Sequence, residues 1–395
     1  MLNKKYESLG KKSSVIRELF EFANKRKKEI GEENVYDFSL GNPSVAPPKI
    51  VDETIKNLLN TSCSVALHGY TSAAGDYEVR QKIAEYISKQ SGKESSADLI
   101  YITCGAAASL TISLSAVTCE NDEVIVLAPF FPEYKVFIEN CGAKTVVCKP
   151  NLNDFTIDFN NLENCFTSNT AAVIINSPNN PSGVVYSNEE IECLANLLYK
   201  MQIKFNKQIY LITDEPYREL VFDNISVPYP SCYYNNTITC YSFSKSLSLP
   251  GERIGYIEVS QDAQNAKDIF AAICGAGRSL GFVCAPSLMQ KTVANCLGKT
   301  SDISVYERNR NYLYKALTEI GYNVVLPNGA FYLMLKCLTN NALQFAEKAK
   351  DFELIIVPSD DFGVDGFVRI ALCVSEKTVK NSIPAFKKLY DYYRS

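Results

Sequence analysis

One lysine lies among hydroxyl side chains in a stretch that suggests covalent chemistry. Lys245 falls within YSFSKSLSLPGER, residues 241–253, where several serines precede Arg253. A lysine with the ordinary pKa of about 10.4 is a poor nucleophile at neutral pH, whereas burial and a nearby cation favour the neutral amine. Lys245 is therefore a candidate for imine formation with an aldehyde. The alternative is a solvated loop lysine, which is the commonest fate of this residue type.

The spacing Ser242-x-x-Lys245 followed by Arg253 resembles the cofactor-lysine signature of fold-type I pyridoxal-phosphate enzymes, in the class I/II family of aspartate-aminotransferase-like proteins. Further matches run in family order from Gly41 to Arg369, so the resemblance covers nearly the whole chain. It implies that Lys245 is the catalytic residue and carries pyridoxal 5′-phosphate as a Schiff base. It also implies that Ser242 and Arg253 bind the phosphate.

Three residues match those that hold the cofactor ring in this family. A protonated ring nitrogen needs a facing carboxylate, and Asp214 in ITDEPY, residues 212–217, ends a predicted strand. The resemblance assigns the ring nitrogen to Asp214 and the ring hydroxyl oxygen to Tyr217 and Asn180. Taken alone, Asp214 is an ordinary turn or cap residue, and the SPNNPSG segment around Asn180 is an ordinary turn.

The phosphate is expected at a helix N-terminus, where backbone N–H groups and the helix dipole bind anions. The run Gly105-Ala106-Ala107 follows a predicted strand and opens a predicted helix. It resembles the family's phosphate cup, although a hydroxyl or amide side chain is common at the position of Ala107. Backbone N–H groups, Ser242 and Arg253 are then expected to carry the phosphate.

An aromatic side chain stacks on the cofactor ring in this family. Phe131, in APFFPEY, residues 128–134, matches that position better than Phe130 because of its spacing between the two prolines. The alternative is an ordinary core aromatic.

Substrate contacts are implied for four residues. Arg369 is a cation in the apolar strand FVRIAL and needs an anionic partner, which a substrate α-carboxylate would supply bidentately. A structural ion pair is the alternative. The resemblance adds Gly41, in a loop that closes over the substrate, and Asn180. Arg278 is a candidate for reading a distal carboxylate in the neighbouring subunit, although the sequence around it departs from the family motif.

The segment HGYTSAAG, residues 68–75, matches one whose tyrosine reaches the phosphate in the neighbouring subunit. Tyr70 is therefore expected to bind the partner's cofactor, which implies a homodimer with shared active sites.

These residues require a scaffold that the hydrophobic pattern predicts. Short apolar runs alternate with turns and helical stretches, which is typical of a mostly parallel sheet flanked by helices, an α/β fold. We expect a seven-stranded sheet in a large domain and a smaller α/β domain formed by the N-terminal segment and the C-terminal third. The expected boundaries are 1–45, 46–285 and 286–395. The seven strands are expected at 99–102, 123–128, 144–148, 171–176, 208–213, 237–243 and 254–259.

Composition excludes several other classes. Lys+Arg 40 against Asp+Glu 44 leaves no basic surface for nucleic acid. The 14 cysteines form no C-x-x-C pair and have one histidine beside them, so no metal site is expected. No apolar run reaches the roughly 18 residues of a membrane span, and the charged start of the chain does not read as a signal peptide. We expect a cytoplasmic protein with reduced thiols.

The resemblance thus implies an aminotransferase that moves an amino group from an L-amino acid to a 2-oxo acid. The expected acceptor is 2-oxoglutarate, and an aspartate-type specificity is one option. A lyase of the same fold, such as a C–S β-lyase or a decarboxylase, would use the same lysine and arginine and stays open. A binding module that retains the fold without the chemistry is the third reading.

Overall fold

The computed structural model describes residues 2–11 and 15–395, which form two compact units. The larger unit comprises Val45–Ile303 and Asn328–Ala330. The smaller unit comprises Met1–Ser44, Ser304–Pro327 and Phe331–Ser395. Each unit has its own sheet, so each is described by itself.

The larger unit is built on a seven-stranded sheet within the described residues, in the order β2-β8-β7-β6-β5-β3-β4. Strands β7, β6, β5, β3 and β4 are parallel, whereas β8 runs antiparallel to both of its neighbours, β2 and β7. The predicted seven-stranded, mostly parallel sheet is confirmed. The strands are β2 (Ile100–Thr103), β3 (Glu123–Leu127), β4 (Lys144–Cys148), β5 (Thr170–Asn176), β6 (Tyr210–Asp214), β7 (Thr237–Ser242) and β8 (Gly255–Val259).

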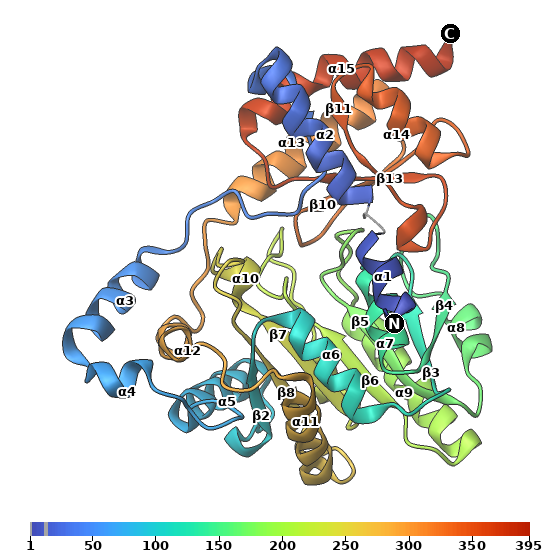
Figure 1. Cartoon of the computed structure of the whole chain (residues 1–395). Coiled ribbons are helices and arrows are strands. Elements are labelled where there is room, and N and C mark those ends of the chain that lie inside the picture. The colour runs from blue at the N-terminus through green and yellow to red at the C-terminus, as the bar shows by residue number, and fades with distance from the viewer. Residues whose placement is uncertain (1, 12–14) are drawn as a thin grey trace. The chain divides into compact units, whose positions relative to one another are not determined.

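Helices cover both faces of this sheet because its strands are apolar on both sides. On one face, Ile100 and Ile102 of β2 pack with residues of α3, α5 and α12. On the other face, Tyr101 packs with residues of α6 and α11, which lie side by side in Figure 1. The helices of this unit are α3 (Lys49–Thr61), α4 (Ser64–His68), α5 (Tyr77–Ser91), α6 (Ala106–Val117), α7 (Glu133–Asn140), α8 (Phe159–Cys165), α9 (Asn188–Phe205), α10 (Phe243–Ser246), α11 (Ala266–Leu280) and α12 (Ser287–Ala294).

The smaller unit joins the two ends of the chain. Strand β1 of the N-terminal segment pairs in parallel with β11, and a four-stranded sheet has the order β12-β13-β10-β9. Helix α2 packs its buried Leu19 and Ala23 against Val357 of β12. The elements are α1 (Lys4–Lys11), α2 (Val15–Ile30), β1 (Tyr36–Asp37), α13 (Ser304–Ile320), β9 (Val324–Val325), β10 (Tyr332–Lys336), α14 (Ala342–Lys350), β11 (Leu354–Ile355), β12 (Val357–Pro358), β13 (Phe367–Ala371) and α15 (Glu376–Arg394).

The division into units differs from the boundary expected at residue 285. Helix α12 belongs to the larger unit, which extends to Ile303. The reason is local bonding: Ser287 donates to the main-chain oxygen of Leu67 at 2.7 Å, and the side chain of Gln290 accepts from the main-chain N–H of Asp76 at 2.8 Å. In the part of the chain that the structure describes, no helix is long and apolar enough to cross a membrane.

Candidate active site

Three neighbouring strands end at one edge of the large sheet with polar residues. Asn176 of β5 pairs with Asp214 of β6, and Asp214 pairs in turn with Cys240 near the end of β7. Parallel strands present their carboxyl ends on the same edge, where ligands bind in open α/β sheets. Lys245 follows β7 in the one-turn helix α10, which Ser242 caps by accepting from the N–H of Ser244. The sequence therefore folds so that Lys245 and Asp214 share this edge.

Asp214 is a buried carboxylate with one oxygen bonded. Its Oδ2 accepts a hydrogen bond from the hydroxyl of Tyr134 at 2.5 Å. Its Oδ1 is buried and has no hydrogen-bond partner among the described residues. Burial raises the pKa of Asp214 to about 7, against the lowering effect of the Tyr134 bond, and the charge of Glu215 raises it further. A protonated ring nitrogen would supply the missing donor and would favour the ionised carboxylate. The residues present therefore fit the predicted cofactor.

Asn176 links the predicted ring-binding residues. Its side-chain amide donates to the main-chain oxygen of Asp214 at 2.8 Å, and its Oδ1 accepts from the N–H of Asn180 at 2.6 Å. Asn180 is 8% exposed, and Tyr217 is 4% exposed in the turn after β6. Tyr217 lies near enough to Tyr134 to contribute to the raised pKa of that phenol, which burial dominates. Sequence reasoning missed Asn176, although a strand-terminal asparagine before Ser-Pro was a usable signal.

The predicted phosphate cup is an open helix N-terminus beside an arginine. Helix α6 begins after Gly105, whose φ of 90° places it outside the region that other residues prefer. A Cβ at Gly105 would lie 2.8 Å from Nη2 of Arg253, so the absent side chain leaves room for that guanidinium. Ala107 is exposed, Ala106 is half-buried, and no side chain caps the start of α6, whose first N–H groups have no partner within the helix.

Ser244 is a second hydroxyl at this cup that the sequence reasoning did not assign. Ser242 Oγ donates to Ser244 Oγ at 2.8 Å, and Nη1 of Arg253 donates to Ser244 Oγ at 3.4 Å. Arg253 has a left-handed φ of 49° and is exposed. Two hydroxyls, a cation and a helix N-terminus thus converge, which is the chemistry that a phosphate requires.

The two phenylalanines after β3 have different surroundings. Phe130 is 1% exposed and belongs to the core, whereas Phe131 is half-buried. The ring of Phe131 meets the ring of Tyr134 edge-on, with centroids 5.8 Å apart and planes at 86°. Of the two, Phe131 is the one that is not enclosed in the core, and its stacking role stays a prediction. Tyr134 was missed because a buried tyrosine in a helix looks like an ordinary core residue.

Gly41 and Arg369 lie in the smaller unit. Arg369 is 2% exposed in β13; its Nη2 donates to the main-chain oxygen of Ser39 at 2.6 Å. Its guanidinium carbon lies 4.6 Å from the ring centroid of Tyr332 and 5.2 Å from that of Phe362. A Cβ on Gly41 would overlap the hydroxyl of Tyr332. The structure thus brings Gly41, Tyr332 and Arg369 together in one cluster of this unit.

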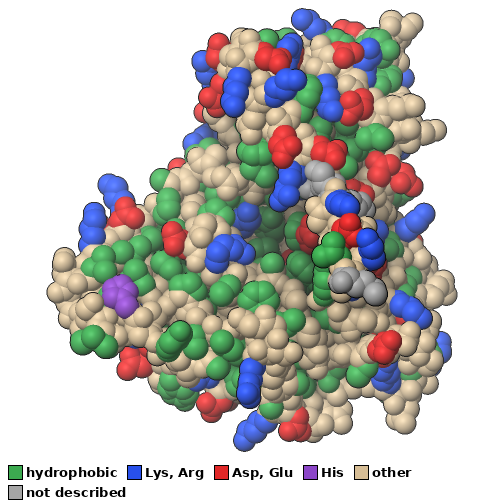
Figure 2. Space-filling model, viewed as in Figure 1, with side chains coloured by type: hydrophobic (Ala, Val, Ile, Leu, Met, Phe, Trp, Pro, Cys, Tyr) green, Lys and Arg blue, Asp and Glu red, His purple; other side chains and the backbone are tan. Residues whose placement is uncertain are grey.

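Tyr70 and Arg278 lie on the surface of the larger unit. Tyr70 is 98% exposed in the loop after α4, and Arg278 is exposed in the last turn of α11. Neither is buried with the cluster around Asp214. Figure 2 shows His68, the purple side chain, with hydrophobic side chains around it; the exposed hydrophobic residues near it in sequence are Leu59, Val65, Tyr70 and Tyr77.

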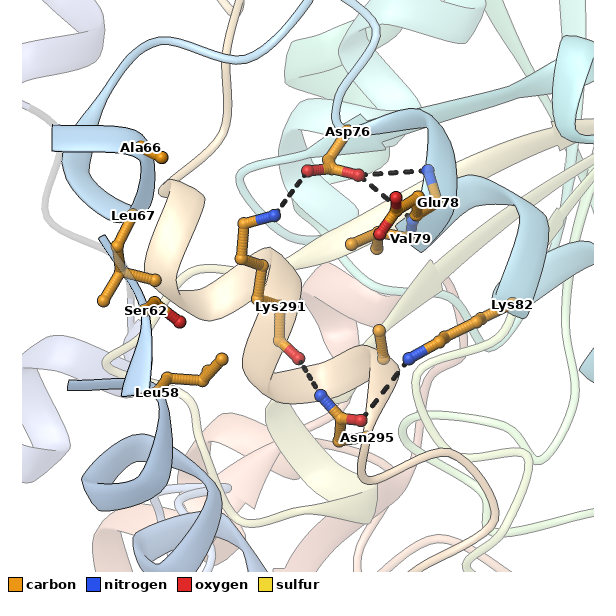
Figure 3. Close-up of a pocket in the computed structure, with 11 residues that line it drawn as sticks. Leu58, Ser62, Ala66, Leu67, Asp76, Glu78, Val79, Lys82, Lys291 and Asn295 are labelled. Carbon is orange, nitrogen blue, oxygen red and sulfur yellow. Dashed lines mark hydrogen bonds and ion pairs between the residues drawn. The ribbon is translucent and has the colours of Figure 1, made fainter. Parts of the chain in front are cut away.

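A cavity of about 340 Å³ lies beside α4 and does not match the predicted site (Figure 3). Lys291 points to Asp76 and forms an ion pair with it at 2.7 Å, and Lys82 donates to Asn295 at 3.4 Å. Four of the polar residues that line this cavity are therefore paired with one another. Among the described residues, no group of three or more His, Cys, Asp or Glu is placed to hold a metal ion.

The comparisons of sequence and of structure with known proteins all indicate the same family. Residues 33–386 match the sequence model of "Aminotransferase class I and II". A crystal structure of an amino transferase from Eubacterium rectale is 51% identical, covers 100% of both chains and has a TM-score of 0.99. The (5-formylfuran-3-yl)methyl phosphate transaminase of Methanocaldococcus jannaschii is 30% identical over 92% of this chain and 93% of its own. The aspartate aminotransferase of Thermotoga maritima is 28% identical over 92% of each chain.

Proposed function

Because the chain belongs to the class I and II aminotransferase family and is an aminotransferase, we propose that it uses pyridoxal 5′-phosphate bound to Lys245. The reaction moves an amino group from an L-amino acid to a 2-oxo acid, with 2-oxoglutarate as the expected acceptor. The bound cofactor supplies an aldehyde that holds the amino group and a ring that withdraws electrons from Cα.

The observation that carries this proposal is the unpartnered, buried Oδ1 of Asp214 at the sheet edge that Lys245 shares. A buried hydrogen-bond acceptor without a donor destabilises the fold. Its presence here therefore favours a bound ligand that donates a hydrogen bond to it. A protonated pyridine nitrogen is such a donor, and its positive charge suits a carboxylate.

The phosphate is proposed to bind at the N-terminus of α6. The N–H groups after Gly105, the hydroxyls of Ser242 and Ser244 and the guanidinium of Arg253 surround that point. Asn180 and Tyr217 are proposed to donate to the ring hydroxyl oxygen, and Phe131 to stack on the ring and exclude water from one face.

Lys245 and Arg369 are proposed to act on the substrate. Arg369 holds the α-carboxylate with its guanidinium, which Ser39 and the two aromatic rings orient. Lys245 would hold the cofactor through its amine and, as a free amine, would act as the base that takes and returns the proton of the substrate Cα.

Borohydride reduction tests the covalent assignment. The purified protein should show a visible absorption band that borohydride abolishes, and mass spectrometry should find the reduced adduct on Lys245. Lys299, an exposed lysine of the same unit, is the control site and should carry no adduct. An adduct on another lysine, or no adduct, would refute the proposal.

The reaction type is tested with a panel of amino acids. Each is mixed with enzyme without any oxo acid, and then with 2-oxoglutarate. An aminotransferase should release the oxo acid of the donor only in a stoichiometric amount until 2-oxoglutarate is added. Continuous release of pyruvate and ammonia from one amino acid would instead favour a lyase of the same fold.

The donor is proposed to include dicarboxylic amino acids if Arg278 reaches the neighbouring subunit's site. Arg278 is exposed on α11, as such a reach requires, but an interface arginine without substrate contact is equally exposed. Arg278→Ala should lower kcat/KM for aspartate and glutamate by about tenfold or more and leave leucine and phenylalanine unchanged. Equal losses in both classes would remove Arg278 from the site.

A homodimer with shared sites is also proposed. Tyr70 at 98% exposure and Val65 at 83% are large apolar side chains in solvent, as at a subunit interface. Sedimentation of the purified protein tests the dimer, and a fully active monomer would refute it.

All of the cysteines are free thiols, which supports the proposal of a reducing, cytoplasmic location.

A further inference from the structure

Tyr134 contacts both residues that are proposed to flank the cofactor ring. Its hydroxyl donates to Oδ2 of Asp214 at 2.5 Å, and its ring meets the ring of Phe131 edge-on at 5.8 Å. The N–H of Tyr134 also donates to the main-chain oxygen of Phe131 at 3.0 Å, which starts α7. Tyr134 is itself 2% exposed, so its ring has one fixed position.

The direction of the hydroxyl bond follows from burial. Burial raises the pKa of Tyr134 well above its ordinary value, and the neighbouring charge of Asp214 adds to this. The phenol therefore keeps its proton and acts as the donor, and the carboxylate of Asp214 is the acceptor. The bond favours the ionised carboxylate, against the effect of burial.

The bond also fixes which carboxylate oxygen remains available. Asn176 holds the backbone of Asp214, and Tyr134 holds Oδ2, so rotation of the carboxylate is restrained. Oδ1 is the oxygen left without a partner among the described residues. A residue that orients the group touching a cofactor commonly affects binding as much as a direct contact does.

We propose that Tyr134 is a positioning residue that sets both ring contacts at once: its hydroxyl aims Oδ1 of Asp214 at the cofactor nitrogen, and its ring holds Phe131 at the stacking angle. This inference rests on the proposed function, because it assumes that pyridoxal phosphate binds here. The contact with Asp214 uses the hydroxyl of Tyr134 and the contact with Phe131 uses its ring, so substitutions can separate the two effects.

Tyr134→Phe removes the hydroxyl and keeps the ring, whereas Tyr134→Leu removes both. The apoprotein is titrated with pyridoxal phosphate, and Kd is measured by quenching of intrinsic fluorescence. Tyr134→Phe should raise Kd about tenfold, the usual effect of a lost hydrogen bond to a charged group, and Tyr134→Leu should raise it several-fold more. Tyr234→Phe is the matched control. Tyr234 is 0% exposed and donates to the main-chain oxygen of Ile209 at 2.6 Å, so its loss should leave Kd unchanged.

A cofactor analogue separates positioning from packing. In 1-deazapyridoxal phosphate a carbon replaces the ring nitrogen, so Asp214 has no nitrogen to bind. The tenfold effect of Tyr134→Phe should shrink to about twofold or less with this analogue. An equal effect with both compounds, or a Kd for pyridoxal phosphate within twofold of wild type, would overturn the proposal. Wild-type protein that binds no pyridoxal phosphate would instead refute the proposed function.

A size-conserving probe covers the case in which Tyr134→Phe does not fold. 3-Fluorotyrosine is placed at position 134, or at 234 as the control, and the ¹⁹F resonance is followed during titration with pyridoxal phosphate. The resonance at 134 should move on binding and that at 234 should not. A stationary resonance at 134 in protein that binds the cofactor would also overturn the proposal.

Discussion

The side-chain amide of Asn176 donates to the main-chain oxygen of Asp214 at 2.8 Å, which ties the end of β5 to the end of β6. The same side chain accepts from the N–H of Asn180. Asn176 is 4% exposed, so both bonds are shielded from solvent. One amide therefore sets the positions of two residues in the proposed ring site.

Asn176→Ala should weaken both the fold and cofactor binding. Two buried partners lose a bond, so the free energy of unfolding should fall by about 2 kcal/mol, and Kd for pyridoxal phosphate should rise. Asn161→Ala is the control, because Asn161 also donates to a main-chain oxygen, that of Lys149 at 3.0 Å, but in a more exposed place. Chemical denaturation and cofactor titration measure the two effects. Equal losses in the two variants would contradict the role given to Asn176.

Asp214→Asn should stabilise the cofactor-free protein and should lower the activity of the enzyme. The pKa of Asp214 is raised from 3.8 to about 7, chiefly by burial. Since the folded-state pKa is the higher one, the contribution of the protonated group is fully present below about pH 4 and is lost as the pH rises through about 7. The variant should therefore melt at a higher temperature than wild type at about pH 8, with a much smaller difference at about pH 4.5, and it should lose most activity.

Glu258→Gln separates these two effects. Burial raises the pKa of Glu258 to about 7, although the Ser95 hydrogen bond lowers it, and Glu258 lies in β8 away from Lys245. This variant should gain stability at about pH 8 in the same way and keep its activity. Calorimetry at the two pH values and steady-state kinetics test both variants. Activity of Asp214→Asn within about threefold of wild type would show that its assignment is wrong.

Gly41→Ala should impair substrate binding through Tyr332. The added Cβ overlaps the Tyr332 hydroxyl, and the Tyr332 ring lies over the guanidinium of Arg369. KM for the amino donor should rise about tenfold with a smaller change in kcat, as expected for lost ground-state binding. Tyr332→Phe in the same chain removes the closest overlapping atom, the hydroxyl oxygen, but leaves ring Cζ 2.7 Å from the added Cβ, so it should restore only part of KM.

Gly275→Ala controls for the added methyl group, because its Cβ meets nothing within 4 Å. If KM of Gly41→Ala were no higher than that of Gly275→Ala, Gly41 would not act through its contact with Tyr332.

Mixed subunits test whether Tyr70 serves the partner's site. Lys245→Ala and Tyr70→Ala proteins, each of low activity, are mixed, dissociated mildly and allowed to reassociate. A mixed dimer then has one intact site and one with both defects. With random pairing, about a quarter of wild-type activity should return. Activity that stays at the level of the unmixed proteins would place Tyr70 in its own subunit's chemistry or outside the site.

The sequence predicted the large sheet well because its strands are buried on both faces. Apolar runs such as 171–176 have no other stable location, and β5 (Thr170–Asn176) differs from that range by one residue. Residues 304–320 have a helical pattern in the sequence, and α13 has the bounds Ser304–Ile320. The apolar run 354–357 looks like one strand in the sequence, but the structure divides it, because β11 pairs with β1 and β12 pairs with β13. Pairing between distant segments is not encoded in a local pattern.

The proposed site was predictable where a residue type is unusual for its place, and not elsewhere. A lysine among serines and an arginine in an apolar strand attract notice, as Lys245 and Arg369 did. Tyr134, Asn176 and Ser244 have residue types that are ordinary for a helix, a strand end and a turn. Only their contacts with Asp214 and Arg253 distinguish them, and those contacts depend on the tertiary structure.

Because β8 runs antiparallel to β7, the length of the segment that connects them is constrained. Ser242 of β7 pairs with Gly255 of β8, so the chain from 243 to 254 leaves and re-enters the sheet at the same edge. Lys245 and Arg253 lie near the two ends of this segment. Both ends are fixed by the antiparallel pairing of β7 with β8. A residue inserted between them would move the amine, the guanidinium or both by several ångströms. Natural insertions and engineered loop grafts are therefore expected elsewhere, while this segment changes only by substitution.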